Sequence, residues 1–137
     1  MIFNEKRRLL IVKPTYKEGW SLPGGTVDAD ESPRAACLRE VKEEIGINIS
    51  KIEFIGVDYQ KKEEYSESLH FMFYGGALSN KQIEKIKLQL SELSEYKFVE
   101  ISEATKMLSA NLGKRVENCL EAIDKHKAIY FENAEII

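Results

Sequence analysis

One stretch of the sequence, from Gly24 to Ile47, constrains the fold and the chemistry of this chain more than any other. It opens on two glycines, passes through Ser32-Pro33 and ends in Gly46-Ile47. Serine is a common helix N-cap, and proline suits the first helical position because the N–H it lacks would have no partner there. Glycine is a common residue just after the end of a helix. The stretch therefore predicts a glycine-rich loop followed by one helix between Ser32 and Gly46.

The predicted helix has an apolar face and an adjoining acidic face. At 100° per residue, four apolar side chains share one sector and three carboxylates share the next. They are Cys37, Leu38, Val41 and Ile45 on the first face, and Glu40, Glu43 and Glu44 on the second. Glu40 and Glu44 are like charges at i, i+4, which costs roughly 0.2–0.5 kcal/mol. A hard divalent cation would relieve this repulsion, and all-oxygen ligation suits Mg²⁺ or Mn²⁺.

The alternative for the acidic face is ordinary exposure to solvent, which is the usual role of a glutamate-rich helix surface. The preceding Leu22-Pro23-Gly24-Gly25 favours a site instead. Two consecutive glycines let the backbone approach a ligand closely, and this loop leads directly into the start of the helix.

The spacing of the whole stretch resembles the signature of the Nudix hydrolases at every position. The matching residues are Gly25, Glu31, Arg39, Glu40, Val41, Glu43, Glu44, Gly46 and Ile47. The resemblance implies a loop-helix-loop, residues 25–47, that lies against a sheet and holds metal ions. It also implies hydrolysis of a nucleoside diphosphate linked to another moiety, by attack of water on phosphorus.

The resemblance assigns roles residue by residue. Glu40, Glu43 and Glu44 would bind Mg²⁺ or Mn²⁺, with a backbone carbonyl near Gly24 completing the shell. Arg39 would fix the geometry of the carboxylates, while Glu31, Gly25 and Gly46 would shape the loop and the helix end. The general base would be Glu43 within the helix, or Glu92 or Glu95 before the last strand. We rank Glu92 ahead of Glu95 because the Glu-Leu pair is the commoner form of that segment in the family.

Length and composition favour one domain that spans residues 1–137, with 43% hydrophobic and 31% charged residues. A net charge of −3 argues against a nucleic-acid partner, since non-specific binding of the phosphate backbone needs a basic surface. No apolar run is long enough for a membrane span or a signal peptide, so we expect a cytoplasmic protein without a membrane partner. Cys37 and Cys119 lie on apolar helix faces and are predicted to be buried free thiols.

The rest of the chain predicts a Nudix-type α/β/α sandwich with a mixed β-sheet and C-terminal helices at about 102–126. The expected strands are a hairpin of residues 1–3 and 7–13, then 20–22, 49–59 with a bulge near Gly56, 69–78 and 96–99. Bulky side chains on both faces predict that strand 69–78 is central and covered on both sides. Residues 60–68 should form a polar loop, and Ser102 should cap a helix to Ser109 that precedes a helix over 112–126. Residues 80–90 stay open between helix and loop, and 128–137 between docked and loose.

Other candidate side chains favour structural roles. His70 is expected to pack, His126 to complement a helix dipole, and Lys81, Lys85 and Lys87 to be solvated. The aromatic candidates for base stacking, which are more often core residues, are Tyr16, Trp20, Tyr59 and Tyr65.

The window after the signature, residues 61–65, carries no proline marker of the dinucleotide or ADP-sugar subfamilies. The small chain and its compact loop favour nucleoside di- or triphosphates, or simple nucleotide-linked compounds, as substrates. Two rival readings are a catalytically silent nucleotide-binding or sensor domain, and an RNA-decapping enzyme, which the net acidity disfavours. Homodimer formation stays open, because members of the family often dimerise.

Overall fold

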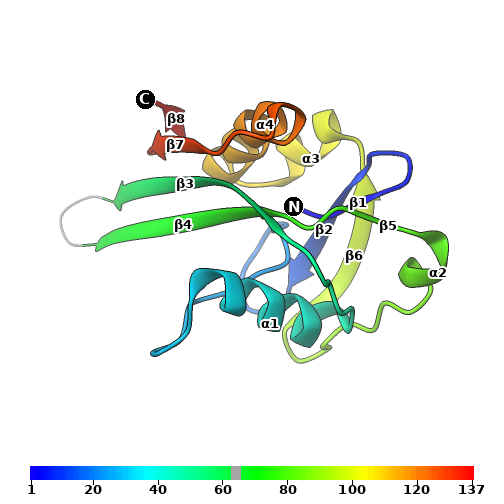
Figure 1. The fold of residues 1–137 in the computed structure, drawn as a ribbon. Helices are drawn as coiled ribbons and strands as arrows, with labels where there is room; N and C mark the ends of the chain where they lie inside the picture. Colours follow the sequence, from blue (N-terminus) through cyan, green and yellow to red (C-terminus); the bar gives the residue numbers. More distant parts are fainter. Residues whose placement is uncertain (63–65) are drawn as a thin grey trace.

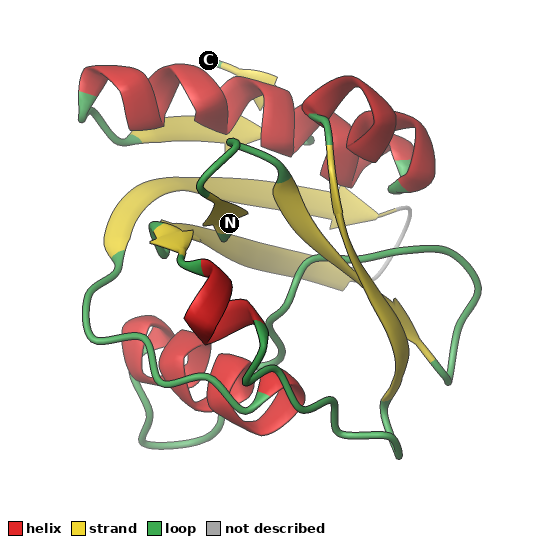
Figure 2. Cartoon of the chain, turned by 90° about the vertical axis from the view of Figure 1, so that its right-hand side faces the viewer, coloured by secondary structure: helices red, strands yellow, loops and turns green. Residues whose placement is uncertain are grey.

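The computed structural model describes residues 1–62 and 66–137, and it places two β-sheets between helices (Figure 1). The strands are β1 (Phe3–Asn4), β2 (Leu9–Pro14), β3 (Glu53–Lys62), β4 (Ser66–Tyr74), β5 (Ala77–Leu78), β6 (Leu93–Val99), β7 (Ile129–Glu132) and β8 (Glu135–Ile136). The helices are α1 (Pro33–Ile45), α2 (Asn80–Ile83), α3 (Ile101–Met107) and α4 (Ala110–Lys125). Helix α1 lies on one side of the strands, and α3 and α4 lie on the other (Figure 2).

Both sheets are mixed, which confirms the predicted α/β class. The first has the order β5-β1-β2-β6, and the second has the order β4-β3-β7-β8. The β1–β5 and β3–β7 pairs are parallel, while the other neighbours are antiparallel. The predicted N-terminal hairpin and the bulge near Gly56 are both present, the latter as a register shift between Phe54 and Gly56.

Alternation along β2 explains why helices cover both faces of the first sheet. Leu9 and Ile11 point into the core cluster that α3 and α4 cover, whereas Leu10 and Val12 point into the cluster that contains Val41 and Ile45 of α1. Successive side chains of a strand face opposite sides, so four consecutive apolar residues require cover on both. The β2 strand is thus the central support of the sandwich.

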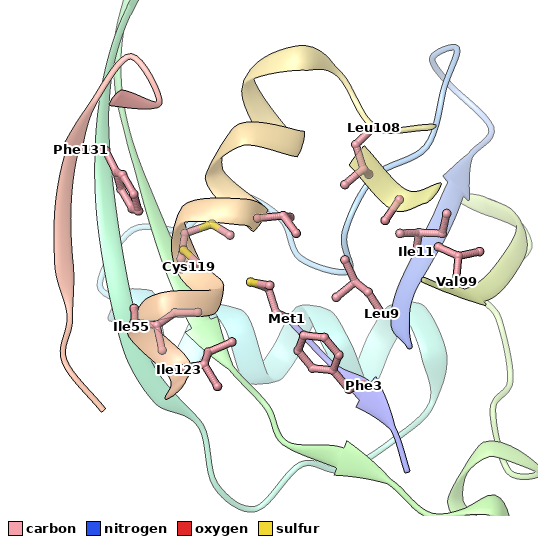
Figure 3. Packing of buried hydrophobic residues seen from close by; sticks show 14 residues of the cluster. Met1, Phe3, Leu9, Ile11, Ile55, Val99, Leu108, Cys119, Ile123 and Phe131 are labelled. Atoms are coloured by element: carbon pink, nitrogen blue, oxygen red, sulfur yellow. The ribbon is translucent and has the colours of Figure 1, made fainter. Parts of the chain in front are cut away.

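The larger core cluster joins the two sheets beneath α4 (Figure 3). Phe131 of β7, Ile55 of β3 and Cys119 of α4 are almost completely buried on one side of it, and Leu9 of β2 on the other. The parallel pairing of β7 with β3 settles the open question about the C-terminal tail, which docks as a strand pair.

Several predicted elements were wrong in detail. Strand β4 is an edge strand, with Leu69 and Phe71 57% and 38% exposed, and is not a covered central strand. Most of the predicted loop 60–68 belongs to the strands, because β3 runs to Lys62 and β4 begins at Ser66. Residues 63–65 of that loop lie outside the described residues.

Residues 20–22 contribute only isolated bridges from Trp20 and Ser21. Helix α3 starts at Ile101 after Glu100, so Ser102 lies within its first turn and does not cap it. Cys119 is a buried free thiol as predicted, whereas Cys37 is only half-buried. No helix among the described residues combines the length and the apolar character that crossing a bilayer would require.

Candidate active site

The structure contains the predicted glycine-rich loop, followed by the predicted helix, α1. The Ser32 Oγ accepts a hydrogen bond from the Ala35 backbone N–H at 3.1 Å, and Pro33 is the first helical residue. Gly46 ends the helix with φ +71°, a left-handed conformation that glycine adopts without steric cost. These local signals fix where α1 begins and ends, and therefore which of its side chains face the loop.

Arg39 links the carboxylates of this segment. Its guanidinium donates to both oxygens of Glu31 at 2.9 Å, to Glu40 Oε1 at 2.7 Å and to Glu43 Oε2 at 3.2 Å. The bidentate hydrogen bond from Arg39 is the largest effect that lowers the pKa of Glu31. Arg39 also donates to the Thr26 carbonyl at 3.2 Å, so one side chain ties the loop to the helix.

Glu44 is the buried member of the acidic face. It is only 4% exposed, and one carboxylate oxygen accepts the Gly24 backbone N–H at 2.8 Å. Burial raises the pKa of Glu44 to about 7, with the charges of Glu40, Glu92 and Glu43 acting in the same direction and the Gly24 N–H acting against them. A bound cation would stabilise the charged form of this carboxylate, because opposite charge favours ionisation.

Gly25 has a steric reason to be glycine. A Cβ built on it would lie 2.4 Å from the Glu40 Cδ and 2.6 and 2.7 Å from its two oxygens. The loop backbone therefore packs directly against a carboxylate of α1.

The donor set fits a divalent cation, although its carboxylates are not gathered around one point. Among residues 1–62 and 66–137, no three Asp, Glu, His or Cys side chains form a group able to hold one ion. Arg39 occupies oxygens of Glu40 and Glu43, while Glu44 turns to Gly24. Clustered carboxylates turn to available N–H donors, and the oxygen-only chemistry of Glu40, Glu43 and Glu44 suits Mg²⁺ or Mn²⁺.

The two outside candidates for the general base differ in their surroundings. Glu92 is half-buried, and its charge contributes to the raised pKa values of both Glu44 and Tyr16, which places it beside the acidic face. Glu95 is exposed on β6 and lies 3.8 Å from Lys97. The structure therefore brings Glu92, and not Glu95, toward the helix glutamates.

A cleft of about 620 Å³ opens from this loop toward the edge strand β4. Gly24 and Gly25 form one part of its wall, His70 and Phe71 of β4 another, and Arg115 of α4 a third. This volume lies in the range of small-molecule sites, which are about 300–1,000 Å³. The residues that touch Glu40 and Glu44 are thus continuous with a concavity large enough for a nucleotide.

The histidine and aromatic candidates from the sequence have different surroundings in the structure. His70 is not simply packed, because it lines the cleft with its Nε2 2.9 Å from the Ser68 Oγ; burial lowers its pKa. Tyr16 is 70% exposed and Trp20 lies near Lys13 and Lys97, while Tyr65 falls outside the described residues.

His126 caps the end of α4 in a left-handed conformation and lies 3.2 Å from Glu53. Sequence reasoning missed the buried set Asp58, Gln60 and Arg115, which no local spacing could reveal.

Comparison with known proteins decides the family. The family model of the NUDIX domain matches residues 1–119 of this chain. The chain belongs to the NUDIX family. The MutT protein of Methanosarcina mazei has a similar structure, with a TM-score of 0.69 and 26% identity over 92% of this chain and 89% of that one. The E. coli dihydroneopterin triphosphate pyrophosphohydrolase, with a TM-score of 0.70 and 18% identity over 85% of this chain and 88% of that one, shares the fold.

Curated NUDIX relatives match over shorter segments. The putative 8-oxo-dGTP diphosphatase of Bacillus subtilis is 38% identical over 73 residues, which is 53% of this chain and 48% of that protein. The RNA pyrophosphohydrolase of Marinomonas sp. is 36% identical over 56 residues, 41% of this chain and 35% of that protein. The chain therefore covers less than half the length of either relative.

Proposed function

We propose that this NUDIX protein is a metal-dependent pyrophosphohydrolase that cleaves a nucleoside diphosphate linked to another moiety. One observation carries the proposal: the folded loop and α1 gather Glu31, Glu40 and Glu43 around Arg39 and bury Glu44 against Gly24, beside a nucleotide-sized cleft. Burying a carboxylate among like charges is unfavourable on its own, and such clusters occur mainly at functional sites.

In this proposal the side chains of the loop and α1 hold the reacting groups. Glu40, Glu43 and Glu44 would bind Mg²⁺ or Mn²⁺, with the Gly24 segment beside them. When bound, the ion neutralises phosphate charge and lowers the pKa of a coordinated water. Arg39 orients Glu40 and Glu43 through its hydrogen bonds, and Glu31 anchors Arg39 from the opposite side.

Glu92 is the proposed proton acceptor for the attacking water. It lies close enough to Glu44 and Tyr16 to raise the pKa of each, yet it lies in the loop before β6 and outside the proposed metal-binding helix. A carboxylate that does not bind the ion keeps its oxygens free to take a proton. Glu43 is the alternative within the helix, and it is half exposed, with 50% of its side chain accessible.

Small nucleotides are the proposed substrates, in particular nucleoside di- or triphosphates. The name of the Bacillus subtilis relative, a putative 8-oxo-dGTP diphosphatase, supports this range. The name of the Marinomonas relative points instead to RNA, but a net charge of −3 gives weak attraction for a polynucleotide.

The test is hydrolysis of a nucleotide panel with Mg²⁺ or Mn²⁺, by wild type and by the Glu44→Gln variant. We expect metal-dependent release of a nucleoside monophosphate, and a loss of at least about a hundredfold in kcat on substitution. A folded protein that binds nucleotides without turnover would contradict the proposal and leave a binding or sensor domain.

The base is tested by the Glu92→Gln and Glu95→Gln pair. Loss of turnover of roughly 10²-fold or more in the first variant alone is expected for a general base. Unchanged turnover in Glu92→Gln would remove Glu92 from the mechanism. Loss only in Glu95→Gln would transfer the role to Glu95.

A further inference from the structure

A buried ionic network lies beside the cleft and takes no part in the chemistry described above. Asp58 is 0% exposed, Arg115 is 5% exposed and Gln60 is 7% exposed. Arg115 Nε donates to Asp58, and its Nη2 donates to Gln60 Oε1 at 3.0 Å. The second oxygen of Asp58 accepts the Ala134 backbone N–H at 3.0 Å. The guanidinium is therefore held rigidly by two residues of β3.

This network leaves part of the guanidinium available. Arginine has five N–H donors, and Asp58 and Gln60 together take two of them. Among residues 1–62 and 66–137, Nη1 has no hydrogen-bond acceptor. Arg115 itself lines the cleft, so the N–H groups that Asp58 and Gln60 leave free adjoin the space where a ligand would lie. A rigid donor with no acceptor capacity thus faces the place where a ligand would lie.

The same cleft connects Arg115 with the acidic face of α1. Gly24 and Gly25, which contact Glu44 and Glu40, line it together with Arg115 and His70. Phe71, Met72 and Leu112 add apolar surface to the same cleft. Phosphates near the glycines would therefore leave the base of a nucleotide to occupy the part of the cleft beside Arg115.

We propose that Arg115, fixed by Asp58 and Gln60, is a specificity-determining residue that selects guanine over adenine in the cleft. This inference rests on the proposed function, of which it names the preferred base. Guanine presents two adjacent acceptors, O6 and N7, which match the two-pronged donor of arginine. Adenine presents a donor at N6 beside its N7 acceptor, so its amino group would oppose the N–H groups of Arg115.

A purely structural role would leave base preference unchanged. The network does connect α4 to β3 and to the turn before β8, and removing one partner of a buried ion pair typically costs about 3–5 kcal/mol. Asn118, one turn further along α4, supplies the matched control, because its side chain donates to the Ala134 carbonyl at 3.0 Å without lining the cleft. Asn118→Ala should therefore lower stability and leave base preference intact.

The kinetic experiment compares kcat/KM for GTP and ATP in wild type, Arg115→Lys and Asn118→Ala. We expect wild type and Asn118→Ala to prefer GTP by roughly tenfold or more, as for other bidentate guanine contacts. Lysine keeps the charge beside Asp58 but loses the fork, so Arg115→Lys should bring the ratio near one, mainly through KM. If that variant is unfolded, the double variant Arg115→Met with Asp58→Asn removes the fork without leaving a buried charge unpaired.

Binding without turnover separates this inference from the proposed function. GMP and AMP are titrated into the metal-free protein by calorimetry. Tighter binding of GMP that disappears in Arg115→Lys supports the inference even if no nucleotide is hydrolysed. Equal binding of GMP and AMP by wild type, or a guanine preference that survives in Arg115→Lys, would overturn it even in an active hydrolase.

Discussion

At the scale of single residues, folding buries the Glu44 carboxyl group and thereby disfavours its charged form. Its carboxyl is 4% exposed, and burial is the main reason that its pKa rises to about 7 from an ordinary value of 4.5. The folded protein therefore binds more protons than the unfolded chain between these two pH values. Its free energy of unfolding should fall as pH rises through this window and stay reduced above pH 7.

Glu44→Gln should remove this pH dependence. In EDTA at pH 8 we expect the variant to exceed wild type in stability by about 1–3 kcal/mol, because one pKa unit corresponds to about 1.4 kcal/mol. At pH 4 the two proteins should differ little. Urea denaturation at both pH values measures this.

Glu43→Gln is the control for Glu44→Gln, since the Glu43 side chain is 50% exposed and should show no comparable effect. Adding Mn²⁺ should narrow the difference at pH 8 by stabilising wild type. A Glu44→Gln variant that is less stable than wild type at pH 8 in EDTA would show that the buried carboxylate does not destabilise the fold.

Gly25 offers a second prediction at this scale. The new methyl group of Gly25→Ala would meet the Glu40 carboxylate, which can swing aside because it is the end of a flexible side chain. We expect a change in stability below about 1 kcal/mol but a loss in kcat on the order of a hundredfold, since small displacements of reacting groups are costly. Thermal denaturation measures the change in stability, and turnover of the same sample measures the loss in kcat. Parallel losses of stability and activity would indicate a backbone defect instead.

At the scale of elements, a serine in the sequence predicted the start of α1 correctly but not the starts of α3 and α4. Ser32 and Gly46 define α1 as expected, but α3 begins at Ile101 after Glu100, which forms no side-chain cap hydrogen bond. Ser102, the expected cap, lies inside α3, whereas Ser109 caps α4 through a hydrogen bond of 3.4 Å from the Leu112 N–H. Two serines seven positions apart therefore have different roles.

The serine pair gives a matched test of capping. Ser109→Ala should lower the free energy of unfolding by about 1 kcal/mol, whereas Ser102→Ala should leave it unchanged or slightly raise it, because alanine favours helix interiors. Chemical denaturation of both variants measures the difference. A larger loss in Ser102→Ala than in Ser109→Ala would refute the helix boundaries described above.

Strand β4 shows why hydrophobic pattern alone misplaced an element. Its alternating bulky residues predicted cover on both faces, yet β4 lies at a sheet edge, and Phe71 is 38% exposed. Apolar side chains on an edge strand can line a ligand cleft as well as a core, and Phe71 and Met72 do so here. Periodicity reports that a face is apolar but not what covers it.

At the scale of the whole molecule, the candidate site divides into a part the sequence could predict and a part it could not. The carboxylates of α1 and their loop are contiguous, so spacing alone placed them on one face. Arg115 lies 57 residues from Asp58 along the chain and 55 from Gln60, and only the packing of α4 on β3 brings them together. Contacts over such separations carry no local pattern, and that is why the cleft wall opposite the glycines was missed.

The two cysteine thiols differ in how deeply the fold buries them. Cys37 is half-buried in the cleft wall, whereas Cys119 is 0% exposed in the core that joins both sheets (Figure 3). Burial raises the pKa of Cys119 to about 12, so its reactive thiolate is scarce as well as inaccessible. Burial also raises the pKa of Cys37, though its surface stays reachable.

A disulfide-exchange reagent at pH 8 should therefore label one thiol of the native protein, Cys37. Cys119 should react only when the whole core opens, at least about a thousandfold more slowly, because opening costs the global free energy of unfolding. GMP bound in the cleft should slow the labelling of Cys37 without changing that of Cys119, and Cys37→Ala should abolish the fast phase. Equal labelling rates for the two thiols would show that the core between the sheets opens locally, since a cooperative sandwich protects Cys119 until both sheets separate.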